Sequence, residues 1–138
     1  MAEQHTARQQ VIAVVGAGRS GTSAMTRGLQ ALGVELGENL KPPGAKNAKG
    51  FFEDRDILDI NYRLHDLVGL RRNGASLHLV DDPLAFPGVD ALHTEAVVTL
   101  ARRFGNDDLW GFKCIGVMRL LPFWERVFAD LGVDLNYV

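Results

Sequence analysis

The 138-residue sequence contains one cysteine, Cys114, and no long hydrophobic run. A single cysteine cannot form a disulfide within the chain, which favours a reducing compartment such as the cytoplasm. The apolar segment 11–15 is far too short to span a membrane or to form the core of a signal peptide. We therefore expect a soluble, cytoplasmic protein with no membrane span.

Excess positive charge is also absent, because the formal net charge is -2 and the charged residues make up an ordinary 23% of the chain. This balance gives no reason to expect nucleic acid as a partner, so partners must be inferred from local motifs. The length suits one domain. We expect a flexible N-terminus over residues 1–10 and a single α/β domain over residues 11–138.

The glycine-rich segment near the N-terminus lacks the lysine of a nucleotide-binding P-loop. Residues 11–15 run without polar alternation, which predicts a strand buried on both faces of a parallel sheet. Gly16, Gly18 and Gly21 follow, and they fit two phosphate-binding spacings at once, G-x-G-x-x-G and G-x-x-x-x-G. The residues around and after these glycines decide what the segment binds.

Neither nucleotide interpretation of this segment is complete. A P-loop continues with lysine and then serine or threonine, whereas this chain continues with Thr22 and Ser23, and Arg19 supplies the positive charge. No apolar strand ends in an aspartate suited to magnesium, which disfavours a kinase-like NTPase. A dinucleotide site needs a second strand that ends in an acidic residue, and the segment around Glu35 and Glu38 is a poor strand. An anion that needs no metal fits better.

Hydrophobic spacing and turn residues predict that helices and strands alternate over the rest of the chain. We expect helices over residues 22–32, 54–70, 89–104 and 122–131, and strands over residues 109–115 and 133–138. Residues 38–50 and 71–88 are expected to be loops, with a turn at Asn73-Gly74 and a short strand as an alternative over residues 76–80. This order predicts a P-loop-like, three-layer α/β/α fold with a mainly parallel sheet, small or truncated at its C-terminal end.

The glycine-rich segment lies where such a fold places its ligand, at the carboxyl end of a strand. Backbone amides at a helix N-terminus point toward anions, and the helix dipole strengthens that attraction. Ser20 or Thr22 is available near the N-cap of the helix. The predicted anion-binding residues are Gly18, Arg19, Ser20, Gly21, Thr22 and Ser23. The alternative is a glycine-rich turn that only joins the strand to the helix.

These six residues resemble the 5′-phosphosulfate loop of sulfotransferases, and a wider run of the chain is similar to a bacterial sulfotransferase family. The similarity extends through residues 32–40, Pro42-Pro43, Asn47, 49–53 and 56–61, and more loosely through residues 110–113 and 120–124. The resemblance implies a protein that binds 3′-phosphoadenosine 5′-phosphosulfate (PAPS). It also implies transfer of the sulfuryl group, without a metal, to a hydroxyl or amine of a small-molecule or carbohydrate acceptor.

The resemblance assigns roles to individual residues. Arg19 takes the position of the family's basic loop residue, which binds the 5′-phosphosulfate and neutralises charge on the leaving oxygen. Glu53 is the candidate base, since a glutamate downstream of the loop has this role in several sulfotransferase branches and its neighbours Phe51 and Phe52 are apolar. The open alternative is that Glu53 helps to cap the helix that begins near Asp54.

Other polar residues near these motifs have two interpretations each. His65 and His78 are either alternative bases or ordinary structural or solvated histidines. The lysines of the loop over residues 38–50 either attract a doubly anionic donor or keep the loop hydrated. These lysines are Lys41, Lys46 and Lys49.

The chain departs from the family pattern at two places. Lys113 matches a family lysine on a later strand, but residues 114–116 differ from the Asp-Pro that relatives often carry. Sulfotransferases bind the donor's 3′-phosphate just after the next core strand, and here that strand, 133–138, is the C-terminus. The alternative function is therefore an inactive, truncated remnant that binds simple anions or associates with other chains. An uncovered sheet edge would favour a homo-oligomer.

Overall fold

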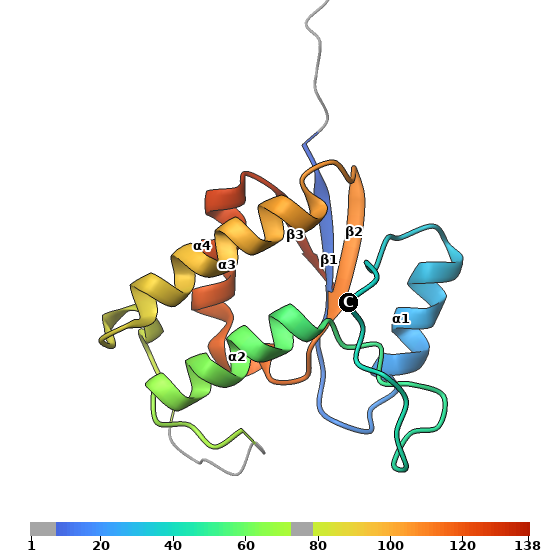
Figure 1. Ribbon diagram of the computed structural model, residues 1–138, viewed down its shortest axis with the longest axis horizontal. Helices are drawn as coiled ribbons and strands as arrows, with labels where there is room; N and C mark the ends of the chain where they lie inside the picture. The colour runs from blue at the N-terminus through green and yellow to red at the C-terminus, as the bar shows by residue number, and fades with distance from the viewer. Residues whose placement is uncertain (1–7, 73–78) are drawn as a thin grey trace, which may run out of the picture.

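Three parallel strands form the central sheet: β1 (Gln10–Val14), β2 (Leu109–Lys113) and β3 (Asp134–Tyr137). Their order is β2-β1-β3, so the first strand of the chain lies in the middle. This computed structural model describes residues 8–72 and 79–138. Because all the strand pairs are parallel, the carboxyl ends of the strands lie at one edge of the sheet, the lower edge in Figure 1.

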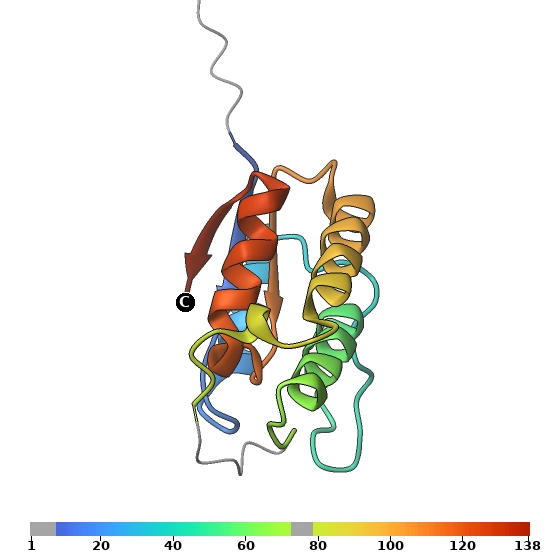
Figure 2. The ribbon, with the colours of Figure 1, turned by 90° about the vertical axis from the view of Figure 1, so that its left-hand side faces the viewer.

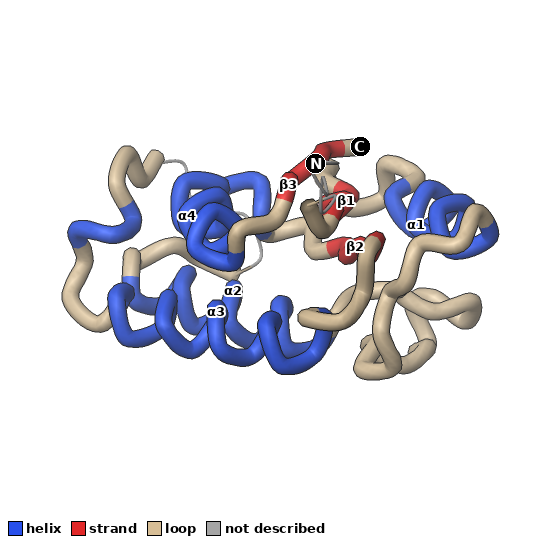
Figure 3. The backbone as a smooth tube through the Cα atoms, turned by 90° about the horizontal axis from the view of Figure 1, so that it is seen from above, coloured by secondary structure: helices blue, strands red, loops and turns tan. Residues whose placement is uncertain are grey.

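Four α-helices of the described part cover the two faces of this sheet. α1 (Thr22–Ala31) lies on one side, and α2 (Arg55–Leu67), α3 (Val89–Phe104) and α4 (Leu121–Leu131) lie on the other (Figures 1 and 3). Figure 2 shows the second group of helices from its own side. The fold is thus a small α/β domain with an all-parallel sheet, as predicted. None of the described helices is long and apolar enough to cross a membrane.

Where elements differ from their expected bounds, the causes are local. The helix expected over residues 54–70 begins at Arg55, because Asp54 is its N-cap, and it ends at Leu67 shortly before Gly69, whose φ is 74°. The strand expected over residues 109–115 ends at Lys113. Two short 3₁₀ helices, η1 (Pro83–Ala85) and η2 (Val117–Leu120), are too short to produce a periodic signal.

Some expectations fall outside the described residues. These are residues 1–7 of the N-terminus, the turn at Asn73-Gly74, His78, and positions 76–78 of the alternative strand. Leu79 and Val80, the described part of that strand, belong to no strand. Residues 38–50 contain no helix or strand, as their proline and glycine content predicts.

The main hydrophobic core lies between the sheet and helices α2, α3 and α4. Within it, Trp124 on α4 donates from Nε1 to Asn61 Oδ1 at 2.9 Å, and His65 Nδ1 lies 2.7 Å from the Asn61 carbonyl oxygen. His65, one of the alternative bases, is 2% exposed and is therefore a structural residue of this core. This buried polar group fixes α2 against α4.

Candidate anion-binding site

The carboxyl ends of β1 and β2 bring two distant segments together. Val14, the last residue of β1, is aligned with Lys113, the last residue of β2, in the parallel register. The glycine loop, residues 15–21, leaves β1 at this point and leads into α1. The register of the sheet therefore places Lys113 beside the glycine loop, although no local sequence signal connects them.

The glycine loop leaves the first turn of α1 open to a ligand. The N-cap is Gly21, whose φ of 91° lies in the left-handed region, and no side chain in the described part of the chain caps the helix. The expectation that Ser20 or Thr22 caps it is wrong, because the Ser20 hydroxyl donates to the Ala17 carbonyl oxygen at 2.6 Å and so shapes the turn. The amides of this first turn remain free to bind an anion.

A second loop, residues 41–53, folds beside the glycine loop. Its base is closed by an antiparallel bridge between Leu40 and Asp54, and its tip by a bridge between Gly44 and Asn47. These two bridges give the 41–53 loop a defined shape without helix or strand. Figure 1 shows this loop next to α1, at the same edge of the sheet as the glycine loop.

Lys113 ties the start of α1 to the 41–53 loop. Its side chain is buried, and the ammonium group donates to the Ser23 hydroxyl oxygen at 3.1 Å and to the Phe51 carbonyl oxygen at 2.7 Å. Burial lowers the pKa of Lys113, while the nearby Glu53 carboxylate opposes that shift. Lys113 thus links β2, α1 and the 41–53 loop at a single point.

Replacing Lys113 with methionine is expected to loosen the 41–53 loop. Methionine keeps an apolar stem but removes both hydrogen bonds, each worth about 1.5–3 kcal/mol for a charged donor. We expect trypsin to cleave after the exposed Lys46 or Lys49 at least about tenfold faster, since cleavage follows local opening. Cleavage after Arg102 in α3 is the internal control and stays constant. An unchanged rate in the loop would show that Lys113 does not hold it.

Glu53 lies at the end of the 41–53 loop with its side chain almost fully buried. Its carboxylate is 3.7 Å from the Lys41 ammonium group, and the side chain is 5% exposed. The alternative that Glu53 caps the next helix is wrong, because Asp54 is the N-cap of α2 and its Oδ1 atom accepts from the amides of Asp56 and Ile57. The Glu53 carboxylate is therefore not used by the helix.

A cavity of about 540 Å³, which we call the loop cavity, lies between the glycine loop, α1 and the 41–53 loop. Five of the six predicted anion-binding residues line it, and so does Glu53, whereas Ser20 does not. Glu53 is the only carboxylate among the lining residues, and five of the others are basic: Arg19, Arg27, Lys41, Lys49 and Lys113. In a chain with a net charge of -2, this concentration of basic groups creates a local attraction for anions.

Two residues of the loop cavity have an unfavourable backbone conformation. Arg19 and Phe52 have φ values of 68° and 56°, and they are the only non-glycine residues with positive φ in the described ranges. Left-handed backbone costs a residue with a β-carbon about 1–2 kcal/mol. Such strain concentrates at functional sites. Each of the two loops therefore holds one strained residue at the same cavity, which supports a functional role for it.

Arg27, Tyr62 and Ile115 line the loop cavity but lie outside the sequence motifs. The sequence indicates only weakly that Arg27 belongs to the site, because Arg27 follows Ser23 by one helical turn and lies on the same face of α1. Tyr62 on α2 and Ile115 after β2 have no such signal, because only the tertiary arrangement brings them here. Burial raises the pKa of Tyr62, and the charge of Glu53 adds to this shift, so the phenol keeps its proton at neutral pH.

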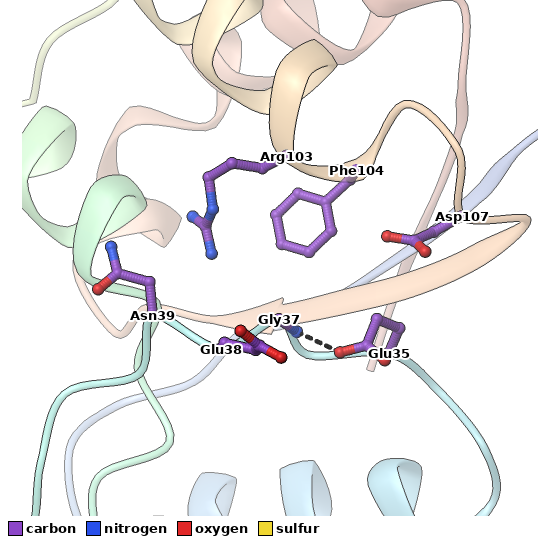
Figure 4. A pocket seen from close by; sticks show the side chains of 7 residues that line it. All are labelled: Glu35, Gly37, Glu38, Asn39, Arg103, Phe104 and Asp107. Carbon is purple, nitrogen blue, oxygen red and sulfur yellow. Dashed lines mark hydrogen bonds between the residues drawn. The ribbon is translucent and has the colours of Figure 1, made fainter.

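A second cavity, of about 450 Å³, lies around Arg103 at the end of α3. In Figure 4, Arg103 and Phe104 lie on one side of it, and Glu35, Gly37 and Glu38 lie on the other. Its arginine and one carboxylate already have partners. The Glu35 carboxylate accepts from the Gly37 amide at 2.7 Å, and Arg103 forms ion pairs outside the cavity lining. This cavity therefore has less charge available for a ligand than the loop cavity.

Comparisons of the chain with models of protein families, with curated proteins and with solved structures give no match. A functional assignment consequently depends on the loop cavity and on the sequence motifs that form it.

Proposed function

We propose that this chain is a sulfotransferase-type protein that binds the 5′-phosphosulfate of PAPS in the loop cavity. The observation that carries the proposal is one cavity that combines an uncapped helix N-terminus, five basic side chains and a single buried carboxylate. The helix N-terminus and the basic side chains suit a polyanion. The carboxylate suits a base that accepts a proton next to the bound polyanion. The glycine loop also lacks the lysine on which Mg²⁺-dependent nucleotide hydrolysis relies.

The residues of the cavity fit the 5′-phosphosulfate half of the donor. The amides of Thr22 and Ser23 at the start of α1, together with the guanidinium of Arg19, would hold it through charge-assisted hydrogen bonds. Arg27 and Lys49 also line the cavity and add positive charge. Ser23 is held by Lys113, so this side of the site is fixed before the donor arrives.

The chemistry divides between these groups. When bound, PAPS supplies a sulfuryl group whose sulfur bonds to the acceptor oxygen as its bond to the 5′-phosphate oxygen breaks, leaving the electron pair on that phosphate. Arg19 and the α1 amides stabilise the negative charge that develops there. Glu53 takes the proton of the acceptor hydroxyl. Lys41, 3.7 Å from Glu53, keeps this carboxylate in place.

Calorimetry with 3′-phosphoadenosine 5′-phosphate (PAP), the nucleotide product, tests the proposal in buffer without magnesium. Arg19→Gly is expected to weaken binding about 10–100-fold, the value of one charge-assisted hydrogen bond. Glycine also suits the positive φ at this position, so the melting temperature should not fall. Arg102→Ala is the matched control, because Arg102 is exposed and does not line the cavity.

Two results would contradict the proposal. One is that the wild-type chain binds inorganic sulfate but not the nucleotide, which would indicate a module for simple anions. The other is that it binds Mg²⁺-ATP more tightly than PAP, which would indicate an NTPase.

A further inference from the structure

The loop cavity has an apolar part that anion binding does not explain. Phe51 and Phe52 belong to the 41–53 loop, Tyr62 comes from α2, and Ile115 follows β2. Ile115 lies against the glycine loop. If Gly18 carried a β-carbon, that atom would lie 3.7 Å from the Cδ1 atom of Ile115. Apolar side chains therefore line the cavity next to the loop that holds the anion, where an acceptor has to bind.

The charge of the cavity selects against cations. Its only carboxylate, Glu53, is already paired with Lys41, and the other charged lining residues are basic. Two of them lie over aromatic rings, with the Lys41 ammonium group 4.3 Å from the centre of Phe51 and the Arg27 guanidinium 5.8 Å from the centre of Phe52. One cation-attracting face of each ring is thus already used by the protein. A protonated amine would meet repulsion without a free counter-charge.

The uncharged polar side chains that line the cavity are Thr22, Ser23, Asn47 and Tyr62, and two of them bond to other groups of the protein. The Asn47 amide donates to the Gly50 carbonyl oxygen at 2.5 Å, and the Ser23 hydroxyl accepts from Lys113 at 3.1 Å. A sugar brings several hydroxyl groups, and each one that loses water needs a new partner. The lining therefore suits a ligand with one hydroxyl and an apolar body.

We propose that the acceptor is a neutral alcohol on an apolar ring or chain, selected over amines and sugars by the wall of Phe51, Phe52, Tyr62 and Ile115. This inference rests on the proposed function, because the alcohol is the acceptor of that reaction. A cavity of about 540 Å³ lies within the usual size of small-molecule sites, roughly 300–1,000 Å³.

Matched probes test this selectivity in the full chain. 2-Naphthylmethanol and 2-naphthylmethylamine have nearly the same shape, but the amine is protonated at neutral pH; glucose is the polar probe. Dissociation constants are measured by calorimetry and by ligand-detected NMR, with and without saturating PAP. We expect the alcohol to bind at least about tenfold more tightly than either the amine or glucose.

A charge reversal at the apolar wall should invert the preference. Ile115 is 41% exposed, so Ile115→Glu is tolerated by the fold, and the new carboxylate should make the amine bind at least as tightly as the alcohol. Met118→Glu is the matched control, because Met118 is 44% exposed on η2 and does not line the cavity. It should keep the wild-type order.

The outcomes separate the two proposals. If PAP binds but the alcohol binds no more tightly than the amine or glucose, the acceptor inference is overturned and the proposed function stands. If the alcohol preference appears without any binding of PAP, the proposed function is overturned. If Ile115→Glu and Met118→Glu change the ranking of the three affinities equally, the inference is also overturned, because the effect then does not come from the apolar wall.

Discussion

Replacing Arg103 with methionine should lower the free energy of unfolding by about 3–5 kcal/mol, the usual result of removing one partner of a buried ion pair. Arg103 Nη2 is 2.7 Å from Asp54 Oδ2, and Asp54 is 1% exposed. A second contact joins Arg103 Nη1 to Asp56 Oδ2 at 2.9 Å. Without the guanidinium, Asp54 would be a buried charge without its cation, retaining only the α2 amides that it caps.

Urea unfolding followed by circular dichroism measures this effect, and a melting temperature about 10–20 °C lower is expected. Arg102→Met is the control, because Arg102 is the neighbouring residue but is exposed. Equal losses for the two variants would mean that the ion pair adds nothing beyond the helical context. A loss below about 1 kcal/mol for Arg103→Met would likewise contradict the prediction, since that is the value of a surface ion pair.

Replacing Glu53 with glutamine should reduce the rate of sulfuryl transfer by about 10²–10⁴-fold, the usual contribution of a general base. Glutamine has almost the same shape but does not accept a proton, so the affinity for PAP should change less than threefold. The reaction is measured with PAPS and 2-naphthylmethanol by detecting the sulfate ester. Glu38→Gln is the matched control, because Glu38 is exposed and does not line the loop cavity.

Two outcomes would contradict the role of Glu53 as a base. A Glu53→Gln variant that is slow and also binds PAP more than threefold more weakly would point to Glu53 as a partner that only positions Lys41. A variant with the wild-type rate would remove Glu53 from the mechanism.

The fold was accessible from the sequence because its elements carry strong local signals. α3 has apolar residues at helical spacing from Val89 to Phe104, and Gly105 ends it as expected. Gly132, with a φ of 69°, ends α4 in the same way. Strand, glycine loop and helix follow one another without interruption, so the position of the predicted anion-binding residues follows directly from the parallel sheet.

The parts of the site that escaped prediction depend on contacts between distant residues. The position of Lys113 beside Ser23 follows from the register of β1 with β2, which no local pattern encodes. Glu53 and Asp54 are adjacent carboxylates, and only the backbone geometry decides that the second one caps α2. Tyr62 belongs to a helix whose neighbours pack into the core, so its place in the cavity is a tertiary effect.

The bridge between Leu40 and Asp54 makes the stretch between them a self-contained insert. Lengthening such an insert is cheap, about 0.6 kcal/mol for each doubling of its length. Because Lys41 and Glu53 stand next to the bridge, changes near Gly44 and Asn47 would leave their pairing intact. Under the proposed function, substitutions in the outer residues of this insert would therefore change the choice of acceptor without disturbing the residues proposed to bind the anion.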